Sequence, residues 1–194
     1  MSPVPESSAR TEPTGDADVA ESAQSVQTDA AAALVGLLTS RQLTIAVAES
    51  LTGGLLVAEL VRIPGASAVV LGGVVAYQTA LKHTLLGVDD ELLAGEGAVH
   101  PEVARQMATG VRAALAVDGR PADIGLATTG VAGPDEQDGR PVGTVYLGIA
   151  IGDKVRAIPL HLTGDRGQIR AQTVYRALEA VCQLMESGKL EFTE

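Results

Sequence analysis

The sequence is poor in aromatic residues, cysteine and basic residues, and each shortage narrows the possible classes of protein. Its 194 residues include no Trp, one Phe and three Tyr, so a core must be aliphatic, and the 46% apolar content is enough to build one. The single cysteine, Cys182, excludes an intramolecular disulfide and fits a reducing compartment. The formal net charge of -10 argues against a sequence-independent binder of nucleic-acid phosphates, which needs clustered Lys and Arg.

Long apolar runs are also lacking, and so is a basic segment followed by an apolar run at the N-terminus. These absences argue against a membrane span and a secretory signal. We therefore expect a cytoplasmic protein that makes no contact with a membrane.

Residues 1–27 contain three prolines, many Ser, Ala and Thr, and almost no large apolar side chains. Such a segment cannot offset its ordering entropy by burial, so we expect a disordered acidic tail. Residues 1–30 hold six acids and one base, which is half of the net charge. The folded domain, expected over residues 28–188 with a short C-terminal tail at 189–194, is then only mildly acidic.

The folded part alternates between helical and strand patterns. Strands are predicted at 43–48, 69–77, 124–128, 142–151 and 154–162, and helices at 29–40, 52–61, 81–86, 90–94, 101–117 and 165–185. The pair Gly152-Asp153 between the last two strands is typical of a type II′ hairpin. Strands mixed with helices and one antiparallel hairpin predict an α/β fold, a three-layer α/β/α domain around a mixed sheet.

The segment Glu49-Ser50-Leu51-Thr52-Gly53-Gly54 lies between a buried strand and a helix, where α/β proteins place ligands. Backbone N–H groups there can hold an anion or a developing oxyanion, and Ser50 could be a nucleophile. The alternative is that Ser50 or Thr52 only caps the helix and the glycines only pack.

A second candidate site is Tyr77 with Lys82, five residues further along a polar turn. A lysine whose pKa is lowered by burial can activate a serine, and a tyrosine hydroxyl can relay a proton or orient the lysine. The alternative is a solvated lysine beside a half-buried tyrosine at a strand end.

Two further segments are candidates for binding. The run from Thr129 and Gly130 to Pro134 is a strand end followed by a glycine-containing loop, or else a turn without chemistry. Arg166 and Arg170 share one helix face and suit bidentate binding of phosphate, or else they are solvated residues behind a capping Asp165.

The three histidines, His83, His100 and His161, show no metal-ligand spacing, so no metal site is expected. Cys182 lies on an apolar helix face and is interpreted as part of the core. His100 precedes Pro101 at a helix start, where capping or solvent exposure is its expected role.

Five stretches taken together are far more specific than any one of them. In order they read AESLTGG, PGASAVVLGGVVAYQTALKHTLLGV, GAVHPEVARQMA, TGVAGPD with RPVGTVYLGIA, and GDRGQIRAQTVYRAL. This series closely resembles the CinA carboxy-terminal domain family over residues 30–186, in its stand-alone form. Leu51 stands where the family often has Cys, which excludes a cysteine nucleophile at that position.

The resemblance implies a hydrolase that converts nicotinamide mononucleotide to nicotinate mononucleotide and ammonia, a pyridine nucleotide salvage reaction. It implies no metal or cofactor and a catalytic set of Ser50, Tyr77 and Lys82. Ser50 would attack the carboxamide, and Lys82 with Tyr77 would move the proton. The expected substrate-binding residues are Thr52, Gly53 and Gly54 for the oxyanion, Arg166 for the phosphate, and Thr129 and Gly130 as pocket walls.

Two alternatives remain open from the sequence. One is a non-catalytic regulatory or protein-interaction module linked to competence or DNA damage, and the other is deamidation of a different pyridine nucleotide or amide. The partners expected are a small-molecule nucleotide substrate and further copies of the chain in a homo-oligomer, with a dimer favoured and no nucleic acid.

Overall fold

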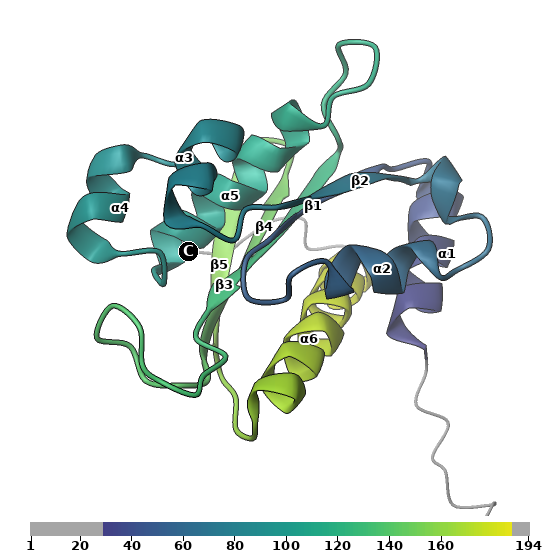
Figure 1. Ribbon diagram of the computed structural model, residues 1–194. Helices are drawn as coiled ribbons and strands as arrows, with labels where there is room; N and C mark the ends of the chain where they lie inside the picture. Colours follow the sequence, from purple (N-terminus) through teal and green to yellow (C-terminus); the bar gives the residue numbers. More distant parts are fainter. Residues whose placement is uncertain (1–28, 188–194) are drawn as a thin grey trace, which may run out of the picture.

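The computed structural model describes residues 29–187, which form a mixed sheet with helices on both faces (Figure 1). The expected tails at 1–27 and 189–194 lie outside the described residues. The strand order is β2-β1-β3-β4-β5, with β1 parallel to both β2 and β3, and β4 antiparallel to β3 and β5. The strands are β1 Ile45–Glu49, β2 Val70–Val75, β3 Ile124–Gly130, β4 Thr144–Ile151 and β5 Lys154–His161. The prediction of a mixed sheet with a final hairpin is confirmed.

Helices cover the two faces in two groups, which gives the predicted α/β/α layers (Figure 1). One face carries α1 Ala30–Arg41, α2 Leu55–Val61 and α6 Arg166–Glu186, and the other carries α3 Thr79–Leu86, α4 Asp90–Glu96 and α5 Pro101–Ala114. A short 3-10 helix, η1, spans Ala66–Ala68. Each face of the sheet buries its own aliphatic cluster. Cys182, 9% exposed, belongs to the cluster under α6, as predicted.

Side-chain caps fix where several helices begin. Asp29 accepts hydrogen bonds from the first turn of α1, and Asp165 forms a capping box with Gln168 at the start of α6. His100 Nδ1 accepts from the backbone N–H of Glu102 at 3.2 Å, so the predicted capping role of His100 is confirmed.

Helix α2 begins later than predicted, at Leu55 instead of Thr52. Gly53 and Gly54 have φ values of +59° and +96°, in the left-handed region that L side chains rarely adopt. The chain therefore makes a tight turn between β1 and α2, and this turn carries Ser50 at its start.

The chain reverses its winding direction beside β1. The connection from β1 to β2 passes through α2 on one face, whereas the connection from β2 to β3 passes through α3, α4 and α5 on the other. At such a switch point the loops leaving the two central strands diverge and leave a crevice, which is where open α/β sheets bind ligands. The carboxyl ends of β1, β2 and β3 all lie at this edge.

Among residues 29–187, none of the helices is long and apolar enough to cross a membrane. No group of three or more His, Cys, Asp or Glu side chains in that range is arranged to hold a metal ion.

Candidate active site

Ser50 and Lys82 lie in direct contact at the carboxyl edge of the sheet. Ser50 follows the last residue of β1, and its backbone N–H donates to the carbonyl oxygen of Thr128 in β3 at 3.0 Å. Lys82 lies in α3, and its Nζ donates to Ser50 Oγ at 3.1 Å. The two residues are 32 positions apart in the sequence, and the parallel pairing of β1 with β2 brings the segments after these strands together.

The lysine side chain is fully buried, which is unusual for this residue type. Besides Ser50, Nζ contacts two backbone carbonyl oxygens, of Ala76 at 2.8 Å and of Tyr77 at 3.4 Å. Burial lowers the pKa of Lys82 from 10.5 to about 8, against a smaller opposing effect of the Asp138 carboxylate. The alternative of a solvated lysine is wrong, because the ammonium group faces three oxygens in the interior.

A cavity of about 360 Å³ opens next to Ser50. Its lining residues come from the loops after β1, β2 and β3, from the Ala98-Val99 segment and from the start of α6: Ser50, Leu51, Tyr77, Gln78, Thr79, Ala98, Val99, Thr129, Gly130, Val131, Ala132, Gly133, Pro134, Asp135, Glu136, Gln137 and Arg166. Lys82 does not line the cavity, but its Nζ contacts two residues that do, through the Ser50 hydroxyl and the Tyr77 backbone carbonyl. The volume suits a small molecule of nucleotide size.

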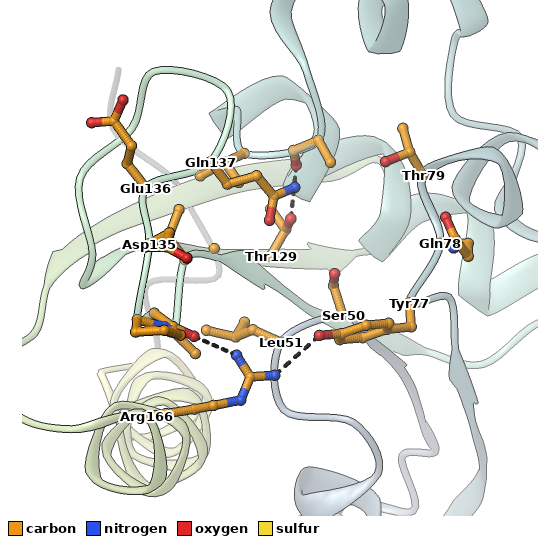
Figure 2. A pocket seen from close by; sticks show the side chains of 17 residues that line it. Ser50, Leu51, Tyr77, Gln78, Thr79, Thr129, Asp135, Glu136, Gln137 and Arg166 are labelled. Atoms are coloured by element: carbon orange, nitrogen blue, oxygen red, sulfur yellow. Dashed lines mark hydrogen bonds between the residues drawn. The ribbon is translucent and has the colours of Figure 1, made fainter.

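Thr129 and Gly130 line the cavity, but as part of β3 and not of the following loop. The strand is longer than predicted because both residues pair with β4. Thr129 Oγ1 donates to the carbonyl oxygen of Ala98 at 2.7 Å, so this hydroxyl holds the opposite wall in place (Figure 2).

Tyr77 and Arg166 face each other across the mouth of the cavity (Figure 2). The guanidinium of Arg166 donates to the Tyr77 hydroxyl at 3.0 Å and to the carbonyl oxygen of Gly133 at 2.7 Å. The tyrosine side chain is 57% exposed, and only its backbone carbonyl approaches Lys82. The structure thus brings the Tyr77 phenol to Arg166, whereas the sequence argument placed it on Lys82.

Arg170, one turn further along α6, has a different target. Its Nε donates to the carbonyl oxygen of Leu51 at 3.0 Å, and Nη2 donates to that of Thr52 at 2.8 Å. Arg170 is half-buried behind the loop and does not line the cavity. Arg166, which the sequence analysis expected to bind the phosphate, and Arg170, its alternative, are therefore distinguished by position.

The backbone N–H groups expected to hold the oxyanion are partly occupied by the protein itself. Glu49, which is fully buried at the end of β1, accepts from the N–H groups of Gly54, Leu56 and Val57 at 2.8–3.0 Å. Gly53 N–H donates to the carbonyl oxygen of Ser50. Neither glycine lines the cavity, and nor does Thr52; after Ser50, Leu51 is the residue of this loop that does.

Thr52 is buried and is tied to β3 by a 2.8 Å hydrogen bond between its hydroxyl and that of Thr128. Within the described residues, the backbone N–H groups of Leu51 and Thr52 have no hydrogen-bond partner. Free donors beside Ser50 thus come from positions 51 and 52, not from the two glycines.

Comparison with known proteins identifies the family of the chain. The family model described as the CinA C-terminal domain matches residues 27–185. The chain belongs to the CinA family. Among curated CinA relatives, a CinA-like protein from Frankia casuarinae is 49% identical over 152 residues, covering 78% of this chain and 34% of that protein. A putative competence-damage inducible protein from Halothermothrix orenii is 48% identical over 143 residues, covering 73% and 33%. The chain thus spans about a third of these relatives' length.

Solved CinA structures share the fold. A CinA superfamily protein from Klebsiella pneumoniae superposes with a TM-score of 0.77 at 30% identity, covering 82% of this chain and 97% of that chain. A competence/damage inducible protein from Agrobacterium tumefaciens gives 0.73 at 34% identity, covering 80% and 95%. The predicted family and fold are confirmed.

Two residues of this CinA site carry roles that the sequence argument did not assign. Glu49 had been noted only as part of its motif, and the signal for its role is an acidic residue before a helix whose first turn has no capping side chain. Asp138 accepts from the N–H of Ala98 at 3.0 Å and places its charge near Lys82. No local pattern marks Asp138, because its partners lie 40 and 56 residues away.

Proposed function

We propose that this CinA domain hydrolyses the amide of nicotinamide mononucleotide to nicotinate mononucleotide and ammonia, with Ser50 as the nucleophile and Lys82 as the base. The observation that carries the proposal is the 3.1 Å contact between Ser50 Oγ and a fully buried lysine amine beside a nucleotide-sized cavity. The substrate follows from the family resemblance, and the reaction type follows from the serine–lysine pair.

The surroundings of Lys82 fit the role of a base. A neutral amine has two N–H donors and one lone pair, and the carbonyl oxygens of Ala76 and Tyr77 can accept from the two donors. The lone pair then faces Ser50 Oγ and can take its proton as the oxygen attacks the carboxamide carbon. The same amine returns the proton to the departing ammonia, and water releases the acyl group by the reverse route.

The oxyanion of the tetrahedral intermediate needs hydrogen-bond donors on the far side from Lys82. The N–H groups of Leu51 and Thr52 are the free donors next to Ser50. Donors of this kind act on charge that develops only in the transition state, and removal of one costs about 3 kcal/mol in comparable enzymes.

Arg166 is the proposed ligand of the substrate phosphate. It is the one basic side chain among the described residues that line the cavity. Hydrogen bonds to Tyr77 and Gly133 use two of its five donors, so the remaining donors are available to an anion. Thr129 and Gly130 form the wall on the β3 side.

Ammonia release by the purified protein tests the proposal, with nicotinamide mononucleotide, nicotinamide and NAD offered side by side. The mononucleotide should be the preferred substrate. Ser50→Ala should abolish release, and Lys82→Arg should be nearly as damaging because a guanidinium does not deprotonate at working pH. Ser40→Ala, at an exposed serine of α1, is the matched control and should leave the rate unchanged.

Two results would contradict the proposal. A well-folded Ser50→Ala protein that retains more than a few per cent of the rate would exclude covalent catalysis through this serine. Absence of ammonia release from all three compounds would favour the regulatory or protein-interaction alternative.

A further inference from the structure

The guanidinium of Arg170 forms hydrogen bonds with the backbone of the loop that carries Ser50. Arg170 donates from Nε and Nη2 to two successive carbonyl oxygens, those of Leu51 and Thr52. The planar fork of an arginine holds both acceptors in a fixed relative geometry, whereas the donors of a lysine ammonium rotate freely. Its contact is close: a Cβ at Gly53 would lie 3.4 Å from Nη2, and Gly53 itself has a φ of +59°.

The hydrogen bond from Arg170 to the Leu51 carbonyl oxygen also sets the direction of the Thr52 N–H group. The carbonyl of Leu51 and the N–H of Thr52 belong to one planar trans peptide, in which the two bonds point in opposite directions. With the oxygen held toward α6, the Thr52 N–H must point away from α6. Thr52 is fully buried, and within the described residues its N–H has no partner. A buried N–H without a partner is rare, which points to a ligand atom as its acceptor.

The rest of the loop is fixed independently of Arg170. The Thr52 hydroxyl bonds to Thr128 in β3, and the Glu49 carboxylate holds the turns after Gly53. The Thr52–Gly53 peptide is also held by the bond from Gly53 N–H to the Ser50 carbonyl oxygen and by the bond from Leu55 N–H to the Thr52 carbonyl oxygen. The Leu51–Thr52 peptide depends on the guanidinium for its rotation, since Arg170 supplies its printed hydrogen bond. This peptide lies directly beside the nucleophile.

We propose that Arg170 is a positioning residue for the serine chemistry, because it orients the Leu51–Thr52 peptide so that its N–H stabilises the oxyanion formed on the carbonyl that Ser50 attacks. This inference rests on the proposed function for its substrate. It assigns the two arginines of one helix face to different steps: Arg166 to binding of the substrate and Arg170 to the transition state.

Steady-state kinetics separate these roles. Arg170→Met should lower kcat by about 10- to 100-fold and leave KM within about twofold of the wild-type value. The loss in kcat should not exceed the loss caused by removing a whole oxyanion donor. Arg170→Lys should recover part of the loss. Arg166→Met should instead raise KM. Arg176→Met is the control, since Arg176 lies on the same helix but pairs with Glu179 on the surface.

A second measurement needs no knowledge of the substrate. An alkyl fluorophosphonate phosphonylates an activated serine through a transition state that also develops negative oxygen, so its rate of reaction with Ser50 reports the same donors. The labelling rate should fall in Arg170→Met by a factor close to the fall in kcat, and should not change in Arg176→Met. The pH dependence of labelling should stay that of the wild type, because Lys82 is not touched.

The outcomes are distinguishable. If the wild type labels Ser50 but releases no ammonia from nicotinamide mononucleotide, the proposed substrate is wrong and the labelling rates still decide the role of Arg170. Unchanged kcat and labelling in Arg170→Met, or a rise in KM alone, would overturn the inference, as would a wild type that does not label at all. If Arg170→Met does not fold, Arg170→Lys decides: wild-type labelling in that variant also overturns it.

Discussion

At the scale of single residues, the protonation state of Lys82 controls the proposed chemistry. At its ordinary pKa of 10.5 a lysine would be neutral in fewer than about one molecule in a thousand at pH 7, whereas a pKa of about 8 leaves roughly one in ten neutral. Burial thus creates a base that works near neutral pH without any negatively charged partner in direct contact.

This environment predicts the pH dependence of the reaction. The charged amine has no lone pair and is inactive, so kcat/KM should fall about tenfold per pH unit below pH 8 and level off above it. Initial rates of ammonia release between pH 5.5 and 9.5 measure the profile. A rate that is independent of pH between 6 and 8 would mean that Lys82 is not the base.

Tyr77 is expected to act through Arg166 and not through Lys82. Tyr77→Phe should therefore raise KM a few-fold and leave the pH profile unchanged, because its hydroxyl accepts from the guanidinium at 3.0 Å. In a double-mutant cycle of Tyr77→Phe with Arg166→Met, the effects on transition-state free energy should deviate from additivity by about 0.5–1 kcal/mol. A shift of the acidic limb of the pH–rate profile in Tyr77→Phe would instead mean that the Tyr77 hydroxyl takes part in proton transfer with Lys82.

Motif position identified Ser50 and Lys82 correctly as neighbours, but it could not give the contacts of Tyr77 and Arg170. Spacing places Arg166 and Arg170 on the same face of α6, yet four residues move a side chain by about 6 Å along a helix. Arg166 consequently reaches Tyr77 at the mouth of the cavity, whereas Arg170 reaches the carbonyl oxygen of Leu51 in the Ser50 loop. Such differences depend on how α6 packs, which no local pattern records.

At the scale of elements, helix α2 depends on a carboxylate from the preceding strand. Its N-cap residue, Gly54, has no side chain, and Glu49 supplies the acceptors for three N–H groups instead. The helix was predicted to begin three residues too early, at Thr52, although its apolar spacing begins at Leu55, because the two glycines between them turn the chain.

Removal of this carboxylate should destabilise the domain. Glu49→Ala leaves three N–H groups without acceptors and should lower the free energy of unfolding by about 2–4 kcal/mol, with Glu49→Gln intermediate. Urea unfolding followed by circular dichroism measures the loss. Glu59→Gln, which affects a surface pair with Arg62, should change it by less than about 0.5 kcal/mol. Equal effects of Glu49→Ala and Glu59→Gln would refute the capping role.

At the scale of the whole molecule, the backbone of α5 packs directly against the backbones of β3 and β4. A Cβ added to Gly125 in β3 or to Gly148 in β4 would overlap the backbone oxygen of Ala108 or Ala104 in α5. The separation of two layers is therefore set by the absence of side chains at these positions. The sequence predicted the layers and the hairpin from periodicity, but not the strand order, because the pairing of β1 with both β2 and β3 is non-local.

A pair of glycine substitutions tests this packing. Gly148→Ala should destabilise the domain by about 1–3 kcal/mol, since the helix must move away from the sheet. Gly36→Ala, within α1 and with open space around it, should stabilise by about 0.5–1 kcal/mol through helix propensity. Thermal and urea unfolding of both variants give the comparison. A neutral Gly148→Ala would show that the layers are not in hard contact.

The Glu49 carboxylate also decides which solutes compete with a substrate. A helix amino terminus left open to solvent attracts sulfate, phosphate and carboxylates from the medium. In this protein that terminus is already neutralised by an internal anion that cannot diffuse away. Buffer anions should consequently inhibit only by binding to Arg166. The N–H groups beside Ser50 then remain available to the neutral carbonyl of a substrate.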